Sequence, residues 1–453
     1  MKALGKIKPT TGPLVTSMIL FALPIAFGSI LQNLFNAFDL IVVRMFANSI
    51  AVASVGATST VTTLFVSSMV GISTGVNIVL ARMIGAKEHE RAKRFISTAI
   101  LSALMLGVIV AVFGVIFGDD VLRLMNCPDD CYDGARTYII VYVLSAPFIL
   151  LYNFAATVIR VEGDTVRPLL YLVCAGITNV ALNLVLCALL EDKVLAVAIA
   201  TVTAQILGAF LTMLRLVRSD SVCSFSFREI TFDFSLCKTL FLYGIPGAIT
   251  DATFAISNLL IQGAINSFGS SVIAGNTGAN KIESLISSIL NGFGSAIGVF
   301  VGQNIGAGNR TRVKRTFLYG TLVTCGTIFV LSMGAFLLRE PLLALFVGDD
   351  AVAIASGCVR FVYIGQFHAI YALRGVLRRT LNGFGYSRFT MVESLISVVL
   401  VRVLWMSLVY PLSPSLEMAY ATYLISAIVS LVIVGPMLAF VFHQYKKGVV
   451  TKI

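Results

Sequence analysis

Charged residues are scarce in this chain. Asp, Glu, Lys and Arg supply 12% of its 453 residues, whereas hydrophobic types supply 58%. Soluble domains carry about 25% charged residues, because water must solvate their surface. The composition therefore excludes an ordinary soluble protein and indicates a chain solvated mainly by lipid.

Residues and motifs typical of catalysis and metal binding are also few. The three histidines, His89, His368 and His443, are far apart in sequence, and no HExxH motif is present. The absence of a GxxxxGKS/T loop argues against nucleotide coupling. The eight cysteines form no CxxC pair, and Cys127 and Cys131, in a C-P-D-D-C run, allow at most a local disulfide. We expect no enzyme activity, no resident metal and no cofactor.

Long apolar runs are what the chain does have. A helix rises about 1.5 Å per residue, so about 20 apolar residues cross a bilayer. Twelve runs meet this length, which predicts twelve transmembrane helices. They cover about residues 16–43, 51–81, 95–117, 134–158, 168–190, 194–214, 239–265, 272–302, 316–338, 352–373, 389–410 and 418–443.

The two halves of the chain repeat one another. The stretch Leu23–Phe95 recurs as Ile245–Thr316. Matched pairs are Pro24 and Pro246, Asn36 and Asn258, and Gly71 and Gly292. Because each half holds six runs, both halves insert in the same orientation, and an axis along the membrane normal relates them.

The predicted fold is an all-α integral membrane protein with two pseudo-symmetric six-helix bundles around a central cleft. The short basic start, MKALGKIKPTTG, is expected to be a retained tail. The predicted parts are a cytoplasmic tail at 1–13, a bundle at 14–215, a linker at 216–237, a bundle at 238–443 and a tail at 444–453.

Loop charges predict the orientation. With the N-terminus inside, most of the 33 Lys and Arg residues fall in the inner segments, while the outer loops are mainly acidic. Short basic loops stay in the cytoplasm, so both termini are expected there, in the cell inner membrane. The net charge of +11 then reflects this topology and contact with anionic lipid, and nucleic acid is not an expected partner.

Charges inside the predicted spans are the first candidates for function, because the bilayer makes them costly. They are Asp39, Asp251, Lys281, Glu283, Arg360, Glu393 and Arg402. Gln32, Asn36 and Asp39 share one face of the first helix. A carboxylate among amides can hold a proton or a sodium ion, and the alternative is a polar stripe that only bonds a neighbouring helix.

Amides on the fifth helix form a second candidate. Asn179 and Asn183 lie one turn apart, and their carbonyl oxygens can coordinate a cation without supplying its counter-charge. Asp39 would then supply most of the negative charge. Two Asn residues in a membrane helix also serve as interhelical contacts, and the sequence leaves both readings open.

The second half carries a different polar set. Asp251, Asn258 and Gln262 line one face of the seventh helix, and Lys281 and Glu283 lie in the eighth. Because a buried cation needs an acid, we expect Lys281 to pair with Asp251 or Glu283 in at least one conformational state. Such a pair is either a static tie or part of a conformational switch.

Five motifs in order resemble the multidrug and toxic compound extrusion (MATE) transporters, over nearly the whole chain. They are A-L-P-I with Q-N-L-F-N-A-F-D (Ala22 to Asp39), R-V-E-G-D-T-V-R-P (Arg160 to Pro168), G-A-N-K-I-E-S (Gly278 to Ser284), V-G-Q-N-I-G-A-G-N (Val301 to Asn309) and L-N-G-F-G (Leu381 to Gly385). The K-I-E-S run is most similar to the branch of DNA-damage-inducible F proteins.

The resemblance implies two six-helix bundles that export amphiphilic, often cationic, small molecules in exchange for Na⁺ or H⁺. It implies that Asp39 is the ion site. This chain departs from the family at Asn183, where an Asp is common, at Phe254, where one branch has Glu, and at Arg44, where glycine is usual.

The predicted mechanism is rocking of the two bundles in a monomer, with Pro24 and Pro246 as hinges. The predicted substrate contacts are Gln32, Asp251, Asn258, Gln262, Lys281 and Glu283. One alternative is a flippase for a lipid-linked saccharide or another anionic amphiphile. A membrane-embedded enzyme is a further alternative, which lacks a catalytic constellation.

Overall fold

The computed structural model describes residues 6–47, 49–124 and 127–448, and it is helical throughout these ranges apart from turns and connections. Packing divides the chain into two units. Unit 1 is Met1–Ile7 with Phe27–Ala248, and unit 2 is Lys8–Ala26 with Ile249–Ile453. Each unit is described by itself below.

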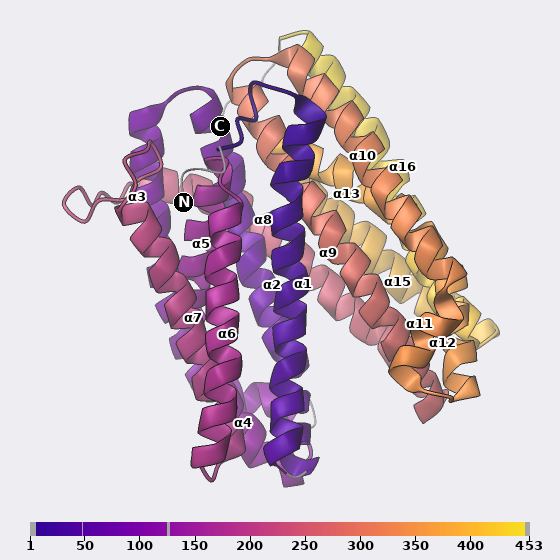
Figure 1. The fold of residues 1–453 in the computed structure, drawn as a ribbon. Coiled ribbons are helices and arrows are strands. Elements are labelled where there is room, and N and C mark those ends of the chain that lie inside the picture. Colours follow the sequence, from indigo (N-terminus) through magenta and orange to yellow (C-terminus); the bar gives the residue numbers. More distant parts are fainter. Residues whose placement is uncertain (1–5, 48, 125–126, 449–453) are drawn as a thin grey trace. The chain divides into compact units, whose positions relative to one another are not determined.

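Unit 1 contains the last part of α1, helices α2 to α7 and the start of α8. Their bounds are α1 Leu14–Phe46, α2 Ser49–Gly85, α3 His89–Leu124, α4 Asp129–Val143, α5 Ala146–Val161, α6 Val166–Leu189, α7 Lys193–Val217 and α8 Phe234–Asn266. Within this unit α6 and α7 pack along their length (Figure 1). A core of Val42, Val43 and Val55 with Val197 ties α1 and α2 to α7.

Unit 2 contains the remaining helices, the start of α1 and the rest of α8. Their bounds are α9 Ser270–Gly306, α10 Arg310–Leu337, α11 Arg339–Val347, α12 Ala351–Tyr363, η1 Gly365–Phe367, α13 His368–Gly383, α14 Ser387–Ser394, η2 Leu395–Leu400, α15 Val401–Leu404, η3 Trp405–Val409, η4 Tyr410–Leu412 and α16 Leu416–Lys446. The segments η2 and η3 are π-helical, so α15 is a single α turn between two wider turns.

Ten helices of the described residues are long and apolar enough to cross a membrane. An eleventh span results if α4 and α5, bent by 45° at their junction, count as one. The predicted span at about 352–373 corresponds to α12 and the start of α13. It falls outside this set because η1 breaks it and because α13 carries arginines. The all-α membrane fold predicted from the sequence is confirmed.

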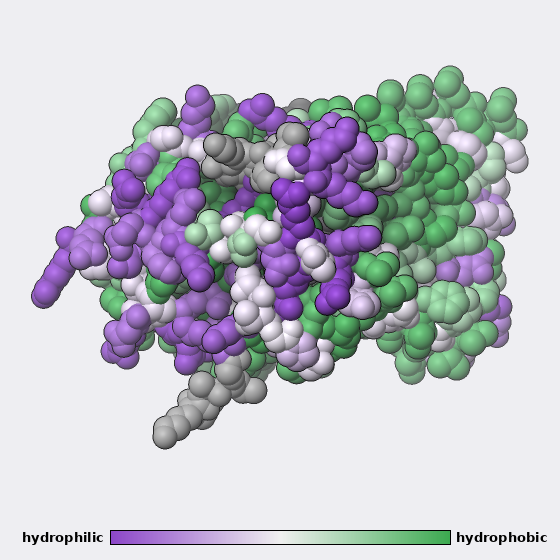
Figure 2. Space-filling view, turned by 90° about the horizontal axis from the view of Figure 1, so that it is seen from above, coloured by the Kyte–Doolittle hydropathy of each residue, from purple (hydrophilic) through white to green (hydrophobic). Residues whose placement is uncertain are grey.

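Hydrophobic side chains remain exposed along these helices, among them Phe113 and Leu322, exposed by 58% and 62%. Hydrophilic side chains gather on the end seen in Figure 2, whereas the flanks in that view are largely hydrophobic. Lipid, and not water, solvates such flanks at no cost.

The two first helices of the repeat each change unit partway along. α1 leaves unit 2 at Ala26, and α8 leaves unit 1 at Ala248, in each case two residues after a proline. Glycines allow the close packing of these helix starts. A Cβ on Gly71 would lie 2.5 Å from Cα of Ala248, and one on Gly292 would lie 2.6 Å from the carbonyl oxygen of Ala22.

Candidate functional site

Asp39 lies in the interior of unit 1, where its side chain is 8% exposed. Its Oδ1 accepts a hydrogen bond of 2.6 Å from Nδ2 of Asn183 on α6. The same Nδ2 also lies 3.4 Å from Oδ1 of Asn179, one turn away. The structure therefore brings together three of the residues that the sequence singled out, from two helices far apart in the chain.

Two residues that the sequence analysis missed complete this group. Nδ2 of Asn179 donates to Oγ1 of Thr201 on α7 at 3.3 Å, and Tyr138 on α4 lies near Thr201 and Asp39. Neither Thr201 nor Tyr138 is charged, so a search for buried charge could not find them. We call Asp39, Tyr138, Asn179, Asn183 and Thr201 the Asp39 network.

The Asp39 network has unused acceptor capacity. Oδ1 of Asn183 is buried and has no hydrogen-bond partner among the described residues. A carboxylate and an amide oxygen are both ligands that a proton or a hard cation can bind. Burial makes a bare negative charge costly here, which favours neutralisation by a bound cation or proton.

The other first-helix candidates are not part of this network. Gln32 is exposed, and the side chain of Asn36 lies outside the described part of the structure. Arg44, also exposed, lies near the end of α1.

Lys281 does not form the expected pair in the conformation of this structure. In unit 2, Nη2 of Arg360 lies 2.7 Å from Oε2 of Glu283, and both side chains are almost fully buried. Lys281 is exposed and forms no ion pair within the described residues. Residues two apart point to different sides of a helix, and α12 packs on α9 and places Arg360 on the buried face with Glu283.

Amides surround this ion pair. Nη1 of Arg360 donates to Oδ1 of Asn276 at 2.7 Å, and Nδ2 of Asn276 donates to Oε1 of Gln262 at 3.1 Å. Tyr420 donates to Asn276 at 3.2 Å. Gln262 therefore belongs to a polar group around Glu283 and Arg360.

The remaining seventh-helix candidates lie apart from that group. Oδ1 of Asn258 accepts from Nη1 of Arg402 at 2.8 Å. Asp251 is partly buried and lies in the electrostatic field of Arg378 and Arg379. The three residues predicted to share one face of the seventh helix therefore lie near different arginines. Asp251 lies near Arg378 and Arg379, and Asn258 contacts Arg402. Gln262 reaches Arg360 through Asn276.

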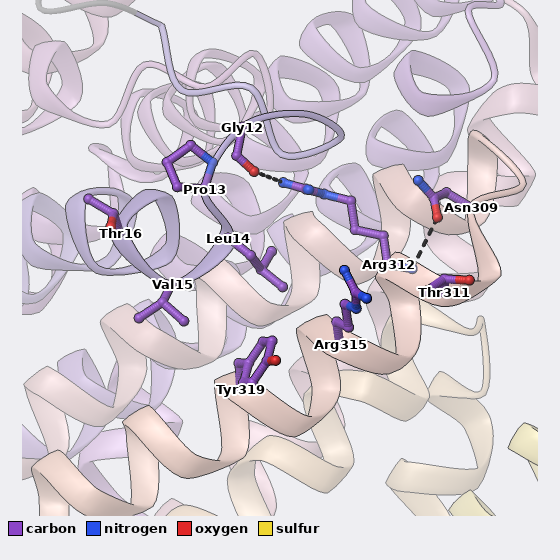
Figure 3. Close-up of a pocket in the computed structure, with 10 residues that line it drawn as sticks. All are labelled: Gly12, Pro13, Leu14, Val15, Thr16, Asn309, Thr311, Arg312, Arg315 and Tyr319. Atoms are coloured by element: carbon purple, nitrogen blue, oxygen red, sulfur yellow. Dashed lines mark hydrogen bonds between the residues drawn. The ribbon is translucent and has the colours of Figure 1, made fainter.

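A cavity of about 470 Å³ in unit 2 lies between the start of α1 and the start of α10 (Figure 3). Nε and Nη2 of Arg312 donate to the carbonyl oxygens of Pro9 and Thr11 at 2.9 and 2.8 Å. Asn309 caps α10 by accepting from the backbone of Arg312. These contacts hold residues 9–12 against α10, and the cavity shares no residue with the predicted ion or substrate sites.

The two loop cysteines are free thiols. Sγ of Cys127 lies 3.8 Å from Sγ of Cys131, and burial raises the pKa of the Cys127 thiol. Within the described residues, no three His, Cys, Asp or Glu side chains group as metal ligands.

Known proteins share this fold. Two solved structures superpose on this chain with a TM-score of 0.89 at 19% identity. One is a MOP superfamily transporter from Pyrococcus furiosus, matched over 98% of this chain and 100% of its own. The other is a multidrug resistance MATE family transporter in an outward-facing conformation, matched over 99% of this chain and 100% of its own. At this identity the likeness concerns the fold alone.

Relatives in sequence span most of the chain. The probable multidrug resistance protein YoeA of Bacillus subtilis is 27% identical over 341 residues, which cover 74% of this chain and 74% of YoeA. The probable multidrug resistance protein YpnP of Bacillus subtilis is 24% identical over 394 residues, which cover 87% of this chain and 88% of YpnP. The multidrug export protein MepA of Staphylococcus aureus is 20% identical over 341 residues, 75% of each chain.

A family model described as MatE matches residues 24–185 and 246–406, which reproduces the internal repeat. The matched segments make up most of the chain, and they agree with the predicted resemblance. These relatives are transporters and not enzymes. The chain belongs to the MatE family of membrane transporters.

Proposed function

We propose that this protein is a secondary active exporter of amphiphilic small molecules, driven by inward movement of protons or sodium ions. The observation that carries the proposal is the Asp39 network, a buried carboxylate held by an amide and surrounded by hydroxyl and amide groups. The names of YoeA and MepA support drug export as the direction and class of transport.

The coupling follows from charge burial. A cation or proton on Asp39 removes the cost of a buried negative charge, and so favours the conformation that closes around it. Substrate binds better in the other conformation, and the two ligands compete through one equilibrium. Asn179 and Asn183 position the carboxylate and offer further oxygen ligands.

The two units rock to expose the substrate path to one side at a time. Pro24 and Pro246 precede the residues at which α1 and α8 change unit, and proline removes a helix hydrogen bond, so bending is proposed at these positions. Gln32, Asn258 and Lys281, all exposed, are the proposed substrate contacts that can be reached.

The basic connections are proposed to face the cytoplasm, in the inner membrane. Within unit 2 the segment from Pro9 to Gly12, the start of α10 and the end of α16 meet at one end, because Arg310 donates to the carbonyl oxygen of Lys446 and Arg312 to those of the tail. Short basic segments stay inside. A monomer in contact with anionic lipid suffices for this scheme.

Ethidium efflux from vesicles reconstituted with the full chain tests the proposal, under a sodium or a proton gradient applied separately. We expect one gradient to drive efflux in the wild type, Asp39→Asn to abolish it, and the exposed control Asp130→Asn to retain it. Efflux that persists in Asp39→Asn would contradict coupling through Asp39. No efflux under either gradient would favour the flippase alternative.

A further inference from the structure

Unit 2 contains more buried arginine than buried acid. Arg360, Arg374 and Arg402 are 6%, 5% and 2% exposed, and Arg378 is partly buried beside them. Arg360 pairs with Glu283, and Nε of Arg378 lies 3.3 Å from Oε2 of Glu393. Within the described residues, Arg374 and Arg402 contact no carboxylate.

Arg374 is the least satisfied of the four. Its Nε and Nη2 are buried without a hydrogen-bond partner in the part of the chain that the structure describes, and its guanidinium lies 4.7 Å from the ring centroid of Phe254. Arg378 is a like charge close by, and the carboxylate in the field of Arg374, Glu393, is already paired with Arg378. Because arginine keeps its proton, an isolated buried guanidinium costs several kcal/mol unless an anion reaches it.

Among the described residues, the groups that contact Arg402 are neutral. Nη1 donates to Asn258 at 2.8 Å, Nε donates to Ser426 at 3.2 Å, and the guanidinium lies over the ring of Tyr423 at 4.5 Å. It stands on α15, the single α turn between π-helical η2 and η3. π-helical turns inside α-helices are frequent at functional sites.

Tyr371 connects the two arginines. It lies within electrostatic range of both Arg374 and Arg402, and its buried hydroxyl has no hydrogen-bond partner within residues 6–47, 49–124 and 127–448. Arg374 and Tyr371 therefore present unused donors, and the guanidinium of Arg402, which has only neutral hydrogen-bond partners in the described residues, lies in the same region. Such a donor set matches a carboxylate or phosphate, which accepts several charge-assisted hydrogen bonds at once.

The aromatic side chains around the two guanidiniums suit the apolar part of an amphiphile. The rings of Phe254 and Tyr423 lie against the two guanidiniums. Asn258, bonded to Arg402, is exposed, so the region can be approached from the α8 face. The other acid nearby, Asp251, is placed toward Arg378 and Arg379.

We propose that unit 2 binds the oxyanion of an acidic amphiphile, a carboxylate or a phosphate, between Arg374, Arg402 and Tyr371. This inference rests on the proposed transport function, since it names a substrate class for it. The site shares no residue with the Asp39 network, which lies in unit 1, so binding of an acidic amphiphile can be measured without an ion gradient.

Binding of dansylaminoundecanoic acid to the purified full chain, followed by fluorescence, tests the site. We expect saturable binding of this acid, binding at least about tenfold weaker for its methyl ester, and a similar loss in Arg374→Gln and in Arg402→Gln. Arg388→Gln, which removes an exposed charge of the same unit, is the matched control and binds as the wild type does.

Thermal unfolding keeps the test decisive if a variant is unstable. The acid raises the unfolding temperature of the wild type and of Arg388→Gln but leaves that of Arg374→Lys nearly unchanged, because lysine lacks the guanidinium fork. Equal binding of acid and methyl ester, or unchanged binding in both glutamine variants, would overturn the proposal.

Competition identifies the source of the oxyanion. Displacement of the probe by phosphatidylglycerol in nanodiscs assigns the site to a lipid headgroup, and displacement by dodecyl phosphate alone assigns it to a free amphiphile; displacement by neither overturns the site. Asp39→Asn separates the two proposals, because it retains probe binding even if ethidium efflux is lost. Failed efflux with intact probe binding refutes only the proposed coupling.

Discussion

The interiors of the two units have diverged although their backbones repeat. Asp39 of unit 1 matches Ile261 of unit 2, which is fully buried in an apolar cluster. Unit 1 holds a buried acid among amides and hydroxyls, whereas unit 2 holds two ion pairs and two further arginines. The repeat thus preserves packing, and the chemistry of each unit is set by a handful of substitutions.

The contrast also concerns what each acid does for folding. Glu283 neutralises a buried arginine, so the fold depends on its charge. Asp39 accepts from a neutral amide, and Asn at that position can accept the same hydrogen bond. We therefore expect that neutralising Glu283 destabilises unit 2, whereas neutralising Asp39 leaves unit 1 folded but abolishes ion coupling.

The largest expected effect is loss of stability in Glu283→Gln. The substitution leaves Arg360 buried without its counter-charge, at a cost of about 3–5 kcal/mol. Thermal unfolding of the purified protein measures it, with the exposed Glu417→Gln as control. Asp39→Asn should change stability by less than about 1 kcal/mol, and an equal loss in both variants would remove the contrast.

Gly71→Ala should destabilise the junction between α2 and α8. Its Cβ would lie 2.5 Å from the backbone of Ala248, so the helices must separate, at about 1–3 kcal/mol. Gly56→Ala on the same helix is the control, because nothing lies within 4 Å of its Cβ. The repeat predicts a similar loss for Gly292→Ala, and unfolding that matches Gly56→Ala would refute the close contact.

Thr201→Val should weaken the Asp39 network without disturbing the fold. It removes the acceptor of Asn179 at an expected cost of about 1 kcal/mol, which raises the ion concentration for half-maximal efflux roughly fivefold. Thr203→Val, on the exposed side of α7, is matched in chemistry and should leave this concentration unchanged. If both variants behave alike, Thr201 has no part in ion binding.

The smallest effect is expected at the start of α12. Asp350 accepts from the backbone N–H groups of Val352 and Ala353, which lowers the pKa of its carboxyl group, whereas Pro128 at the start of α4 offers no side-chain cap. A lowered folded-state pKa gives stability that is present above the unfolded pKa, about 3.9, and is lost as pH falls through the folded value.

Asp350→Asn keeps the cap but removes this titration. We expect unchanged thermal stability at pH 7 and a slightly smaller loss than the wild type on acidification below about pH 4. Unfolding temperatures measured across this pH range check the prediction. A larger acid loss in Asp350→Asn than in the wild type would contradict it.

Part of the Asp39 network could be found from sequence, and part could not. Asp39, Asn179 and Asn183 stand out because charged or amide side chains are costly in lipid. Thr201 and Tyr138 do not, since hydroxyls occur throughout membrane helices and bond their own backbone. The partner of Glu283 was missed for another reason. Helical periodicity orders residues along one helix, and it carries no information on which other helix supplies the opposite charge.

Some properties of this protein follow from the sequence by itself. Long apolar runs force helices, because lipid leaves backbone groups no other partners, and the repeat forces two like halves. Tertiary structure alone decided that α1 and α8 each change unit after a proline, that Arg360 neutralises Glu283, and that Arg374 and Arg402 lie within electrostatic range of Tyr371. These features depend on side chains distant in sequence approaching within a few ångströms, which only packing determines.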